Sequence, residues 1–128
     1  MLLYEELSNK VLRAYFNVID SLSFGYSEDV YENALCIEFD EMGIPYERQK
    51  LLNVHYKNHL VGTFKPDIVV DGKIILELKA VASVPPIHEA QIYNYLAITG
   101  IDIGYILNFG ENRTYRRFLR KGANLQNP

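Results

Sequence analysis

The segment Lys73-Ile74-Ile75-Leu76-Glu77-Leu78-Lys79-Ala80 is typical of a β-strand. After Lys73 it is apolar except for two charges, Glu77 and Lys79. Successive side chains of a strand point to opposite faces, so the even-numbered residues share one face. Glu77 and Lys79 share the other face, about 7 Å apart. Charges at the centre of an apolar strand are costly unless they are paired, solvated or bound to a metal. The run therefore predicts either an exposed salt bridge on a one-sided sheet or a functional site.

The preceding segment, Phe64–Val70, ends at an Asp71-Gly72 turn, and the length of that turn decides where Asp67 points. A two-residue loop would place Asp67 on the apolar face, whereas a three-residue loop places it beside Glu77 and Lys79. Because a slip of one residue turns every side chain to the opposite face, the apolar pattern favours the three-residue loop. We therefore predict a bulged hairpin that gathers Asp67, Glu77 and Lys79 on one face.

Asp67 and Glu77 held side by side would repel each other, and a hard divalent cation relieves that repulsion. Mg²⁺ prefers such oxygen ligands and keeps several of its waters. A cation held there polarises a phosphodiester and activates water, and Lys79 would position that water or stabilise developing charge. Asp67 taken alone is equally compatible with an ordinary acid at a turn or strand edge.

Glu28 stands at the start of an expected helix that Ser27 can cap. An acid in a first helical turn is favoured by the helix dipole, which is explanation enough for both Glu28 and Asp29. Glu28, however, lies three residues before Tyr31 and seven before Leu35, on the stripe expected to face the core. This spacing favours a functional position for Glu28, aimed at the sheet.

Three polar residues of a later helix, His88, Gln91 and Tyr95, are spaced by three and four and share one face. Gln91 there would orient a water or a phosphate near the metal. A capping or surface role is the commoner explanation for His88. Tyr95 and Tyr31 are expected to be core aromatics with hydrogen-bonded hydroxyls.

The rest of the pattern predicts helices and strands around this hairpin. Helices are expected at Tyr4–Leu22, from Ser27 to about Met42 with Gly43 as the stop, and from Pro85-Pro86 to Gly100. Strands are expected at Tyr46–Tyr56 (the weakest), Leu60–Val70, Lys73–Ala80, Ile103–Phe109 and, as an edge, Thr114–Leu119, with a Lys57-Asn58 turn after the first. The order α-α-β-β-β-α-β, with a parallel crossover, gives an α/β (α+β) fold in which helices flank a mixed sheet.

Composition narrows the class of protein. With 128 residues, 48% hydrophobic and 23% charged, the chain is expected to form one domain over residues 1–128. Its start, Met1-Leu2-Leu3-Tyr4-Glu5-Glu6, lacks a signal-peptide pattern, and no apolar run approaches the roughly 20 residues that cross a bilayer. We expect a cytoplasmic protein without membrane contact, in which the lone Cys36 is a buried, inert thiol.

The formal net charge of −3 does not suggest non-specific binding of nucleic acid. Basic residues nevertheless crowd the C-terminal end: Arg113, Arg116, Arg117, Arg120 and Lys121. Such a cluster could meet phosphates, although a solvated terminal face is the commoner explanation.

Several short motifs occur in a fixed order: Gly25-Tyr26-Ser27-Glu28-Asp29-Val30-Tyr31, Lys65-Pro66-Asp67, Glu77-Leu78-Lys79, His88-Glu89-Ala90-Gln91 and Asn94-Tyr95-Leu96. Together they resemble the GxxExxY proteins, a family within the PD-(D/E)XK nuclease superfamily. The resemblance runs from about Phe24 to about Phe109, and the ordered set is far more specific than the Glu-X-Lys tripeptide alone. Ser23 departs from the pattern, since a glycine often stands there, and this affects loop flexibility more than chemistry.

The resemblance implies a restriction-endonuclease-like αβββαβ core, here with an extra N-terminal helix. It implies that Asp67 and Glu77 ligate a divalent metal, Mg²⁺ or Mn²⁺, with Glu28 as a further acidic member. It also implies that Lys79 assists the attacking water and that Gln91 supports the site. Fold and site transfer within such a superfamily more safely than substrate does.

The leading hypothesis is a metal-dependent nuclease acting on DNA, because the acid-acid-lysine set is complete and has a plausible third carboxylate. The alternative is a nucleic-acid-binding or assembly module that keeps the nuclease fold without cleaving, and a purely structural interaction role comes third. Because a domain this small offers little surface to wrap a duplex, we expect a homodimer.

Overall fold

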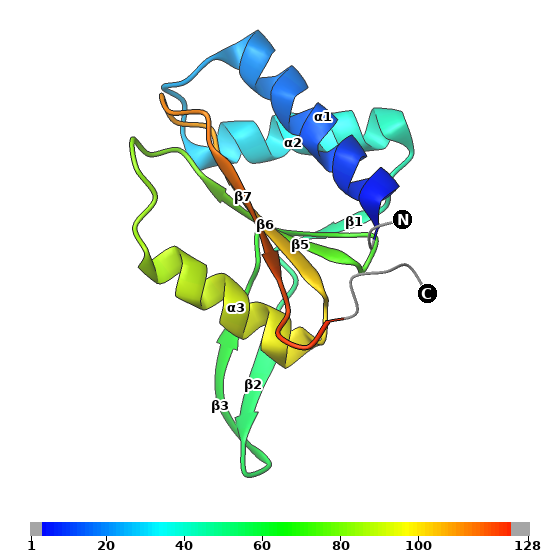
Figure 1. Ribbon diagram of the computed structural model, residues 1–128, viewed down its shortest axis with the longest axis vertical. Helices are drawn as coiled ribbons and strands as arrows, with labels where there is room; N and C mark the ends of the chain where they lie inside the picture. Colours follow the sequence, from blue (N-terminus) through cyan, green and yellow to red (C-terminus); the bar gives the residue numbers. More distant parts are fainter. Residues whose placement is uncertain (1–3, 124–128) are drawn as a thin grey trace.

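The computed structural model describes residues 4–123 as three helices and seven strands (Figure 1). The helices are α1 (Glu5–Leu22), α2 (Glu28–Met42) and α3 (Ile87–Thr99). The strands are β1 (Tyr46–Arg48), β2 (Leu52–Tyr56), β3 (His59–Phe64), β4 (Ile68–Val70), β5 (Ile74–Lys79), β6 (Ile103–Asn108) and β7 (Tyr115–Leu119). The first three residues of the chain, on which part of the signal-peptide argument rests, lie outside the described range.

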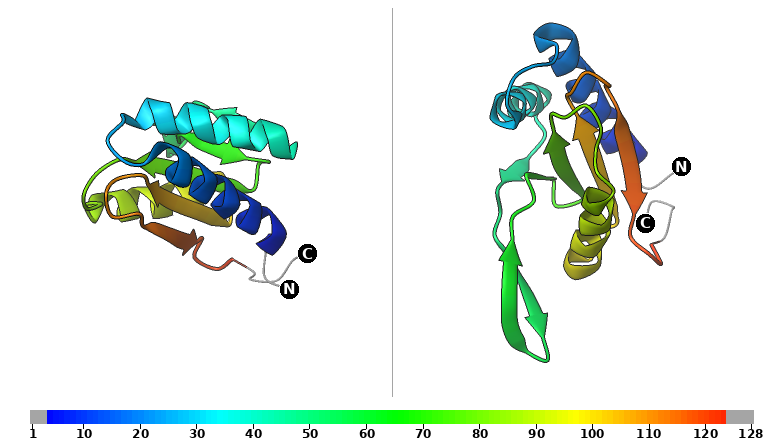
Figure 2. Two further views of the ribbon diagram at one scale, coloured as in Figure 1. Left: turned by 90° about the horizontal axis from the view of Figure 1, so that it is seen from above. Right: turned by 90° about the vertical axis from the view of Figure 1, so that its left-hand side faces the viewer.

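Five strands form a mixed sheet in the order β1-β4-β5-β6-β7. Strands β5 and β6 are parallel and are joined through α3, while the other neighbouring strands are antiparallel. Helices α1 and α2 cover one face and α3 covers the other (Figures 1 and 2). The expected α+β architecture of a mixed sheet flanked by helices is therefore confirmed, with β7 as the expected edge strand.

Each face of the sheet has its own apolar core. On the α1 and α2 face, Tyr15, Leu35 and Phe39 pack with the inward side chains of β4 and β5. On the α3 face, Ile92 and Leu96 pack with Val69, Ile75, Ile106 and Phe118. Because both faces are covered, β4 and β6 are buried at every position, which accounts for their nearly continuous apolar sequences.

The loop between β4 and β5 has the three-residue length that the apolar pattern favours. Val70 pairs with Ile74 and Ile68 with Leu76, which leaves Asp71, Gly72 and Lys73 in the loop. Asp71 and Gly72 adopt positive φ angles of 50° and 64°, and the Lys73 N–H donates to the Val70 carbonyl. The bulge predicted for this hairpin is absent, because the register is continuous through the three paired positions. The odd-length loop alone places Asp67 on the same face as Glu77.

The expectation of single strands at Tyr46–Tyr56 and Leu60–Val70 was wrong, because each segment splits between two sheets. Gln49, with a φ of 52°, ends the first part. Pro66, which has no N–H for a sheet ladder, separates β3 from β4. The outer parts, β2 and β3, form a separate hairpin around the expected Lys57-Asn58 turn and project from the body (Figure 2).

The helix ends follow the expected signals with one exception. Gly43 and Gly100 end α2 and α3 in the left-handed conformation, with φ of 69° and 72°. Ser27 precedes α2, but its side chain makes no capping hydrogen bond; only its carbonyl accepts, from Val30 N–H. Within residues 4–123, none of the helices combines the length and apolar character needed to cross a bilayer. Cys36 is buried, as expected, and burial raises the pKa of its thiol.

Candidate functional site

Asp67 and Glu77 lie across from each other just beyond the last β4–β5 pair, at the end of the hairpin that is away from its turn. The pairing of Ile68 with Leu76, continued by one residue, places these two carboxylates at partner positions. Asp67 Oδ2 also accepts a 2.7 Å hydrogen bond from the Leu78 N–H. The expected convergence of the two acids on one face of the sheet, the face covered by α3, is thus present in the fold.

Glu77 is held in a setting that disfavours its charge. One carboxylate oxygen, Oε1, is buried and has no hydrogen-bond partner. Burial, followed by the nearby charge of Asp67, raises the pKa of Glu77 to about 8, while the charge of Lys79 lowers it in part. A carboxyl with an unsatisfied oxygen and a raised pKa is a feature of functional sites more often than of structural ones.

Asp67 is perturbed in the same direction. Burial raises the pKa of its carboxyl, and the hydrogen bonds from Leu78 and Gln49 oppose that rise. The charges of Glu32 and Glu28 raise the Asp67 pKa further. Acids from helix α2 therefore stand close enough to act on a carboxylate of the sheet.

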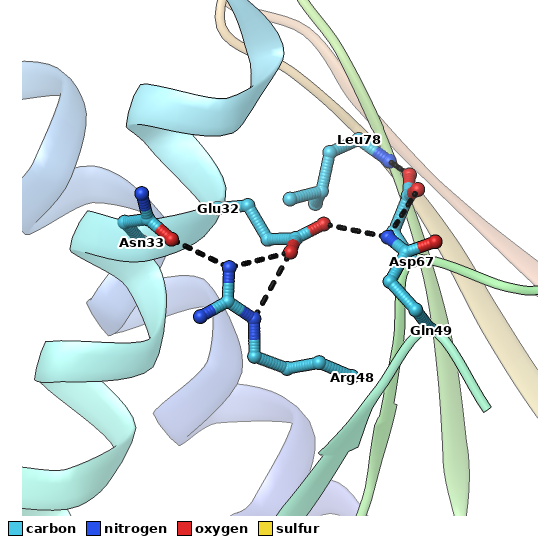
Figure 3. A network of polar contacts seen from close by, with 6 residues as sticks. All are labelled: Glu32, Asn33, Arg48, Gln49, Asp67 and Leu78. Atoms are coloured by element: carbon cyan, nitrogen blue, oxygen red, sulfur yellow. Dashed lines mark hydrogen bonds and ion pairs between the residues drawn. The ribbon is translucent and has the colours of Figure 1, made fainter.

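A polar network ties α2 to this end of the sheet (Figure 3). Glu32 Oε2 accepts from the Arg48 guanidinium at 2.7 and 3.0 Å, and Glu32 Oε1 accepts from Gln49 Nε2 at 3.1 Å. The same Gln49 amide donates to Asp67 Oδ1 at 3.4 Å. The Gln49 backbone N–H also donates to the Asp67 carbonyl, at 3.1 Å. Gln49, which is held in turn by Glu32, thus contacts Asp67 from the β1 side of β4.

Sequence reasoning missed Glu32, although one signal was present. Glu32 lies four residues after Glu28 and so belongs to the same side of α2. Gln49 carried no signal, because its contact with Asp67 depends on the pairing of β1 with β4, which is distant in sequence.

Glu28 is placed differently from the prediction. Tyr31 and Leu35 of its stripe are buried in the core on the α1 and α2 face, opposite the face that holds Glu77. Glu28 itself is exposed in the first turn of α2 and has no hydrogen bond to a described residue. Its charge nevertheless raises the pKa of both Asp67 and Glu77. It therefore approaches the pair from the helix end rather than from the core.

Lys79 follows Glu77 on the same face of β5 and is partly buried. Its ammonium forms no ion pair with a carboxylate of residues 4–123. The exposed-salt-bridge explanation of this strand therefore does not describe the fold: Glu77 is half-buried, and the charge of Lys79 lowers its pKa without an ion pair between the two side chains.

The polar residues of α3 divide into two groups. Gln91 is exposed and its Oε1 pairs with His88 Nδ1 at 3.2 Å, so its amide is engaged on the helix surface. Tyr95 stacks on Phe64 with ring centroids 4.1 Å apart, and burial and the charges of Glu77 and Asp67 raise the pKa of its hydroxyl. Tyr95 thus lies nearer the carboxylates than we expected, and its hydroxyl has no hydrogen-bond partner among the described residues. Tyr31 matches the expectation, because its hydroxyl donates to the Ser23 carbonyl at 2.7 Å.

Most of the C-terminal basic cluster is engaged within the chain. Arg113 pairs with Asp20, Arg116 with Glu89, and Arg120 with Asp102. Arg117 and Lys121 are exposed and form no ion pair with residues 4–123. This arrangement favours a solvated, internally paired face over a phosphate-binding one.

Asp67 and Glu77 are the donors that this site offers to the divalent metal expected from the sequence. Among residues 4–123, His, Cys, Asp and Glu side chains do not gather in threes in a way that could hold an ion. Asp67 and Glu77 do fit a cation with few protein ligands, since Mg²⁺ is commonly bound by one or two carboxylates and keeps several waters. The unpartnered Glu77 Oε1 is the atom that such an ion would satisfy.

A hollow of about 490 Å³ lies beside the β4–β5 turn and the start of α1, lined in part by Tyr4, Lys10, Ile44, Asp71 and Lys73. This is the opposite end of the β4–β5 hairpin from Asp67 and Glu77. We assign the site on the chemistry of Asp67 and Glu77 and not on this hollow, because an open cation site needs no deep cavity.

Comparison with known proteins supports the fold. The family model described as PD-(D/E)XK nuclease superfamily matches residues 5–120. A solved structure titled "Crystal structure of SSO0001" superposes with a TM-score of 0.52 at 14% identity, covering 91% of this chain. This chain spans 59% of the length of that structure. No curated protein matches the chain in sequence.

Proposed function

The chain belongs to the PD-(D/E)XK nuclease superfamily, and from this premise we propose that it is a metal-dependent nuclease that hydrolyses DNA phosphodiester bonds. The observation that carries the proposal is the opposition of Asp67 and Glu77, with a buried Glu77 oxygen that has no partner. A fold kept only for its shape would gain stability by replacing this pair with apolar residues. Its presence supports a function that needs the charges.

Asp67 and Glu77 would hold the divalent cation, Mg²⁺ or Mn²⁺, and Glu28 would complete the acidic set from the end of α2. When bound, the cation supplies Lewis acidity toward a phosphodiester and offsets the repulsion between a phosphate and two carboxylates. Gln49 and the Leu78 N–H keep the Asp67 carboxylate in place. Glu32, which accepts from the Arg48 guanidinium, also accepts from the Gln49 amide and so holds the Gln49 side chain in place.

Lys79 is the residue that we assign to the reacting groups. Lys79 lies two residues after Glu77 on the same face of β5. Its ammonium is not neutralised by an ion pair within residues 4–123. It is therefore free to orient an attacking water or to stabilise charge that develops on the phosphate. Gln91 is assigned a supporting role, which requires it to leave His88 when substrate binds.

The test is a cleavage assay on plasmid, linear duplex and single-stranded DNA with Mg²⁺, Mn²⁺ or EDTA. Wild type is expected to cleave with either metal and to stop in EDTA. Asp67→Asn and Glu77→Gln should each lose at least about 100-fold in rate. Glu41→Gln, which removes an exposed acid of α2, is the matched control and should cleave normally. Equal rates for wild type and Glu77→Gln would end the enzyme proposal.

A non-cleaving nucleic-acid-binding or assembly module is the second candidate. The exposure of Glu28 favours it, because among residues 4–123 this third acid does not join Asp67 and Glu77 in a three-carboxylate cluster that could hold an ion. Binding of DNA that persists in EDTA and in Asp67→Asn, with no cleavage by wild type, would support this candidate.

The finer parts of the proposal remain predictions. They are membership of the GxxExxY family, a cytoplasmic location and a homodimeric state. The ordered motifs around Glu28, Asp67 and Gln91 support the first, and sedimentation of the purified chain measures the last.

A further inference from the structure

The β2–β3 hairpin forms an arm that contains none of the residues proposed to act in catalysis. We define the arm as residues 50–65, which include both strands and the Lys57-Asn58 turn. It projects away from the sheet and helices (Figures 1 and 2). Several of its apolar side chains are exposed, among them Tyr56 at 63%, Leu60 at 59% and Val61 at 60%. An isolated two-stranded ribbon has little stability of its own, so such exposure suggests that something covers it.

The charge of the arm is opposite to that of the rest of the chain. It contains Lys50, Lys57, Lys65 and two histidines but no aspartate or glutamate, in a chain with 13 basic and 16 acidic residues. Lys57 and Lys65 are exposed and have no ion pair within residues 4–123, whereas Lys50 pairs with Glu47 at 3.4 Å. A basic ribbon on an acidic protein points to an anionic partner.

The base of the arm joins the carboxylate site directly. The residue that precedes it, Gln49, donates to Asp67, and the segment that follows it runs through Pro66 into Asp67. At the end of β3, the Phe64 ring stacks on Tyr95. The pKa of the Tyr95 hydroxyl is raised by burial and then by the charges of Glu77 and Asp67. A polyanion whose backbone reaches Asp67 and Glu77 would therefore pass close to the arm.

We propose that the arm is a duplex-DNA contact that lies in a groove beside the phosphodiester presented to Asp67 and Glu77. This inference rests on the proposed nuclease function and names how the substrate is held. A two-stranded ribbon fits the major groove of B-DNA, where lysines reach phosphates and apolar side chains reach thymine methyl groups. With β2 spanning about 17 Å, the arm covers roughly five base pairs along the helix axis.

The experiment measures binding of the full chain to a fluorescent 30-base-pair duplex by anisotropy, in EDTA so that no cleavage occurs. The arm variants are Lys57→Glu and Lys65→Glu. The control is Lys10→Glu, which makes the same charge change on α1, and Arg117→Glu tests the rival C-terminal cluster. Each arm variant should weaken binding and flatten the plot of log affinity against log salt by about one unit of slope per lysine. Melting temperatures within error of wild type establish that the variants are folded.

A second measurement separates this inference from the nuclease proposal. Hydrolysis of the small diester bis(p-nitrophenyl) phosphate with Mn²⁺ reports on the carboxylates without the arm. Loss of duplex binding with normal small-diester hydrolysis supports the arm. Normal duplex binding by both arm variants overturns it, even if Glu77→Gln abolishes cleavage. Arm-dependent binding with no cleavage by wild type keeps the arm and rejects the nuclease.

Four further outcomes count against the arm. Wild type that does not bind the duplex, or that binds a 30-nucleotide single strand more tightly, overturns the groove contact. A change of sedimentation in Lys57→Glu with unchanged DNA affinity would assign the arm to a second copy of this chain. Weaker binding in Arg117→Glu alone would assign the contact to the C-terminal cluster.

Discussion

The Oδ2 atom of Asp67 accepts a 2.7 Å hydrogen bond from the backbone N–H of Leu78, the residue that follows Glu77. One strand therefore fixes the carboxylate of its neighbour at the position where the two acids face each other. The Leu78 N–H of β5 thus donates to an acidic side chain rather than to a backbone carbonyl of the sheet. This bond makes the pair a defined site rather than two acids at a strand edge.

Metal binding is the first expected outcome. Isothermal titration of the wild-type chain with Mn²⁺ at pH 8 should show one site, and Glu77→Gln and Asp67→Asn should show none. Glu41→Gln removes an exposed acid of the same chain and should bind as wild type does. An unchanged isotherm in Glu77→Gln would place any metal elsewhere.

Stability should fall with rising pH in the absence of metal. The pKa of Glu77 is about 8 in the folded chain, against an ordinary value of 4.5. Between those values the unfolded chain has lost a proton that the folded chain keeps, so ionisation favours unfolding by up to about 1.4 kcal/mol per pH unit. Urea unfolding from pH 5 to pH 8 measures the slope.

Two comparisons check the origin of that slope. Glu77→Gln should flatten the stability profile and should be the more stable protein at pH 8 in EDTA. Added Mn²⁺ should restore the stability of wild type at pH 8, because a cation bound to the folded state alone shifts the equilibrium toward it. Identical profiles for wild type and Glu77→Gln would contradict the raised Glu77 pKa.

Lys79→Met should separate chemistry from metal binding. Loss of the ammonium that we assign to the reacting groups is expected to lower kcat by about 10² to 10³. Because the charge of Lys79 lowers the pKa of Glu77, this variant should raise that pKa further, as read by carboxyl NMR. Mn²⁺ titration at high pH should still show one site. Normal kcat in Lys79→Met would remove Lys79 from the mechanism.

Asn108 should prove important for the stability of the strand end that carries Lys79. Its buried amide accepts from the N–H groups of Val81 and Gly110 and donates to the Val81 carbonyl. Asn108→Ala leaves these groups unpaired and should cost about 2 to 4 kcal/mol in urea unfolding. Asn112→Ala removes an exposed amide that donates to Ala82 and should cost less than about 1 kcal/mol.

Gly110→Ala should be as damaging as the loss of Asn108, for a steric reason. A Cβ at this position would clash with the Val81 carbonyl oxygen and lie 2.6 Å from its carbonyl carbon. Backbone cannot move aside as a flexible side chain can, so the loop after β6 must separate from the segment after β5. Gly62→Ala, on the arm with nothing near its added carbon, is the matched substitution and should change the melting temperature little.

Local patterns along the chain were sufficient for much of the fold. The period of apolar residues and the Gly43 and Gly100 stops located the helices within a residue or two, because helix periodicity and left-handed caps are local properties. The alternation around Asp67 and Glu77 also favoured the three-residue turn, since a slip of one residue would bury an acid among apolar side chains.

What tertiary structure decided was everything that joins distant segments. The splitting of Tyr46–Tyr56 depended on β1 finding β4, and the same pairing brought Gln49 to Asp67. Tyr31 and Leu35, which share a helical stripe with Glu28, pack on one face of the sheet, whereas Glu77 points to the other face. Helical spacing shows which residues share that stripe, but it could not tell whether Glu28 at its end would be buried. The ion pairs of Arg113, Arg116 and Arg120 likewise join partners that lie far apart in the chain. Spacing fixes which residues share a face, and only the packed fold decides what that face meets.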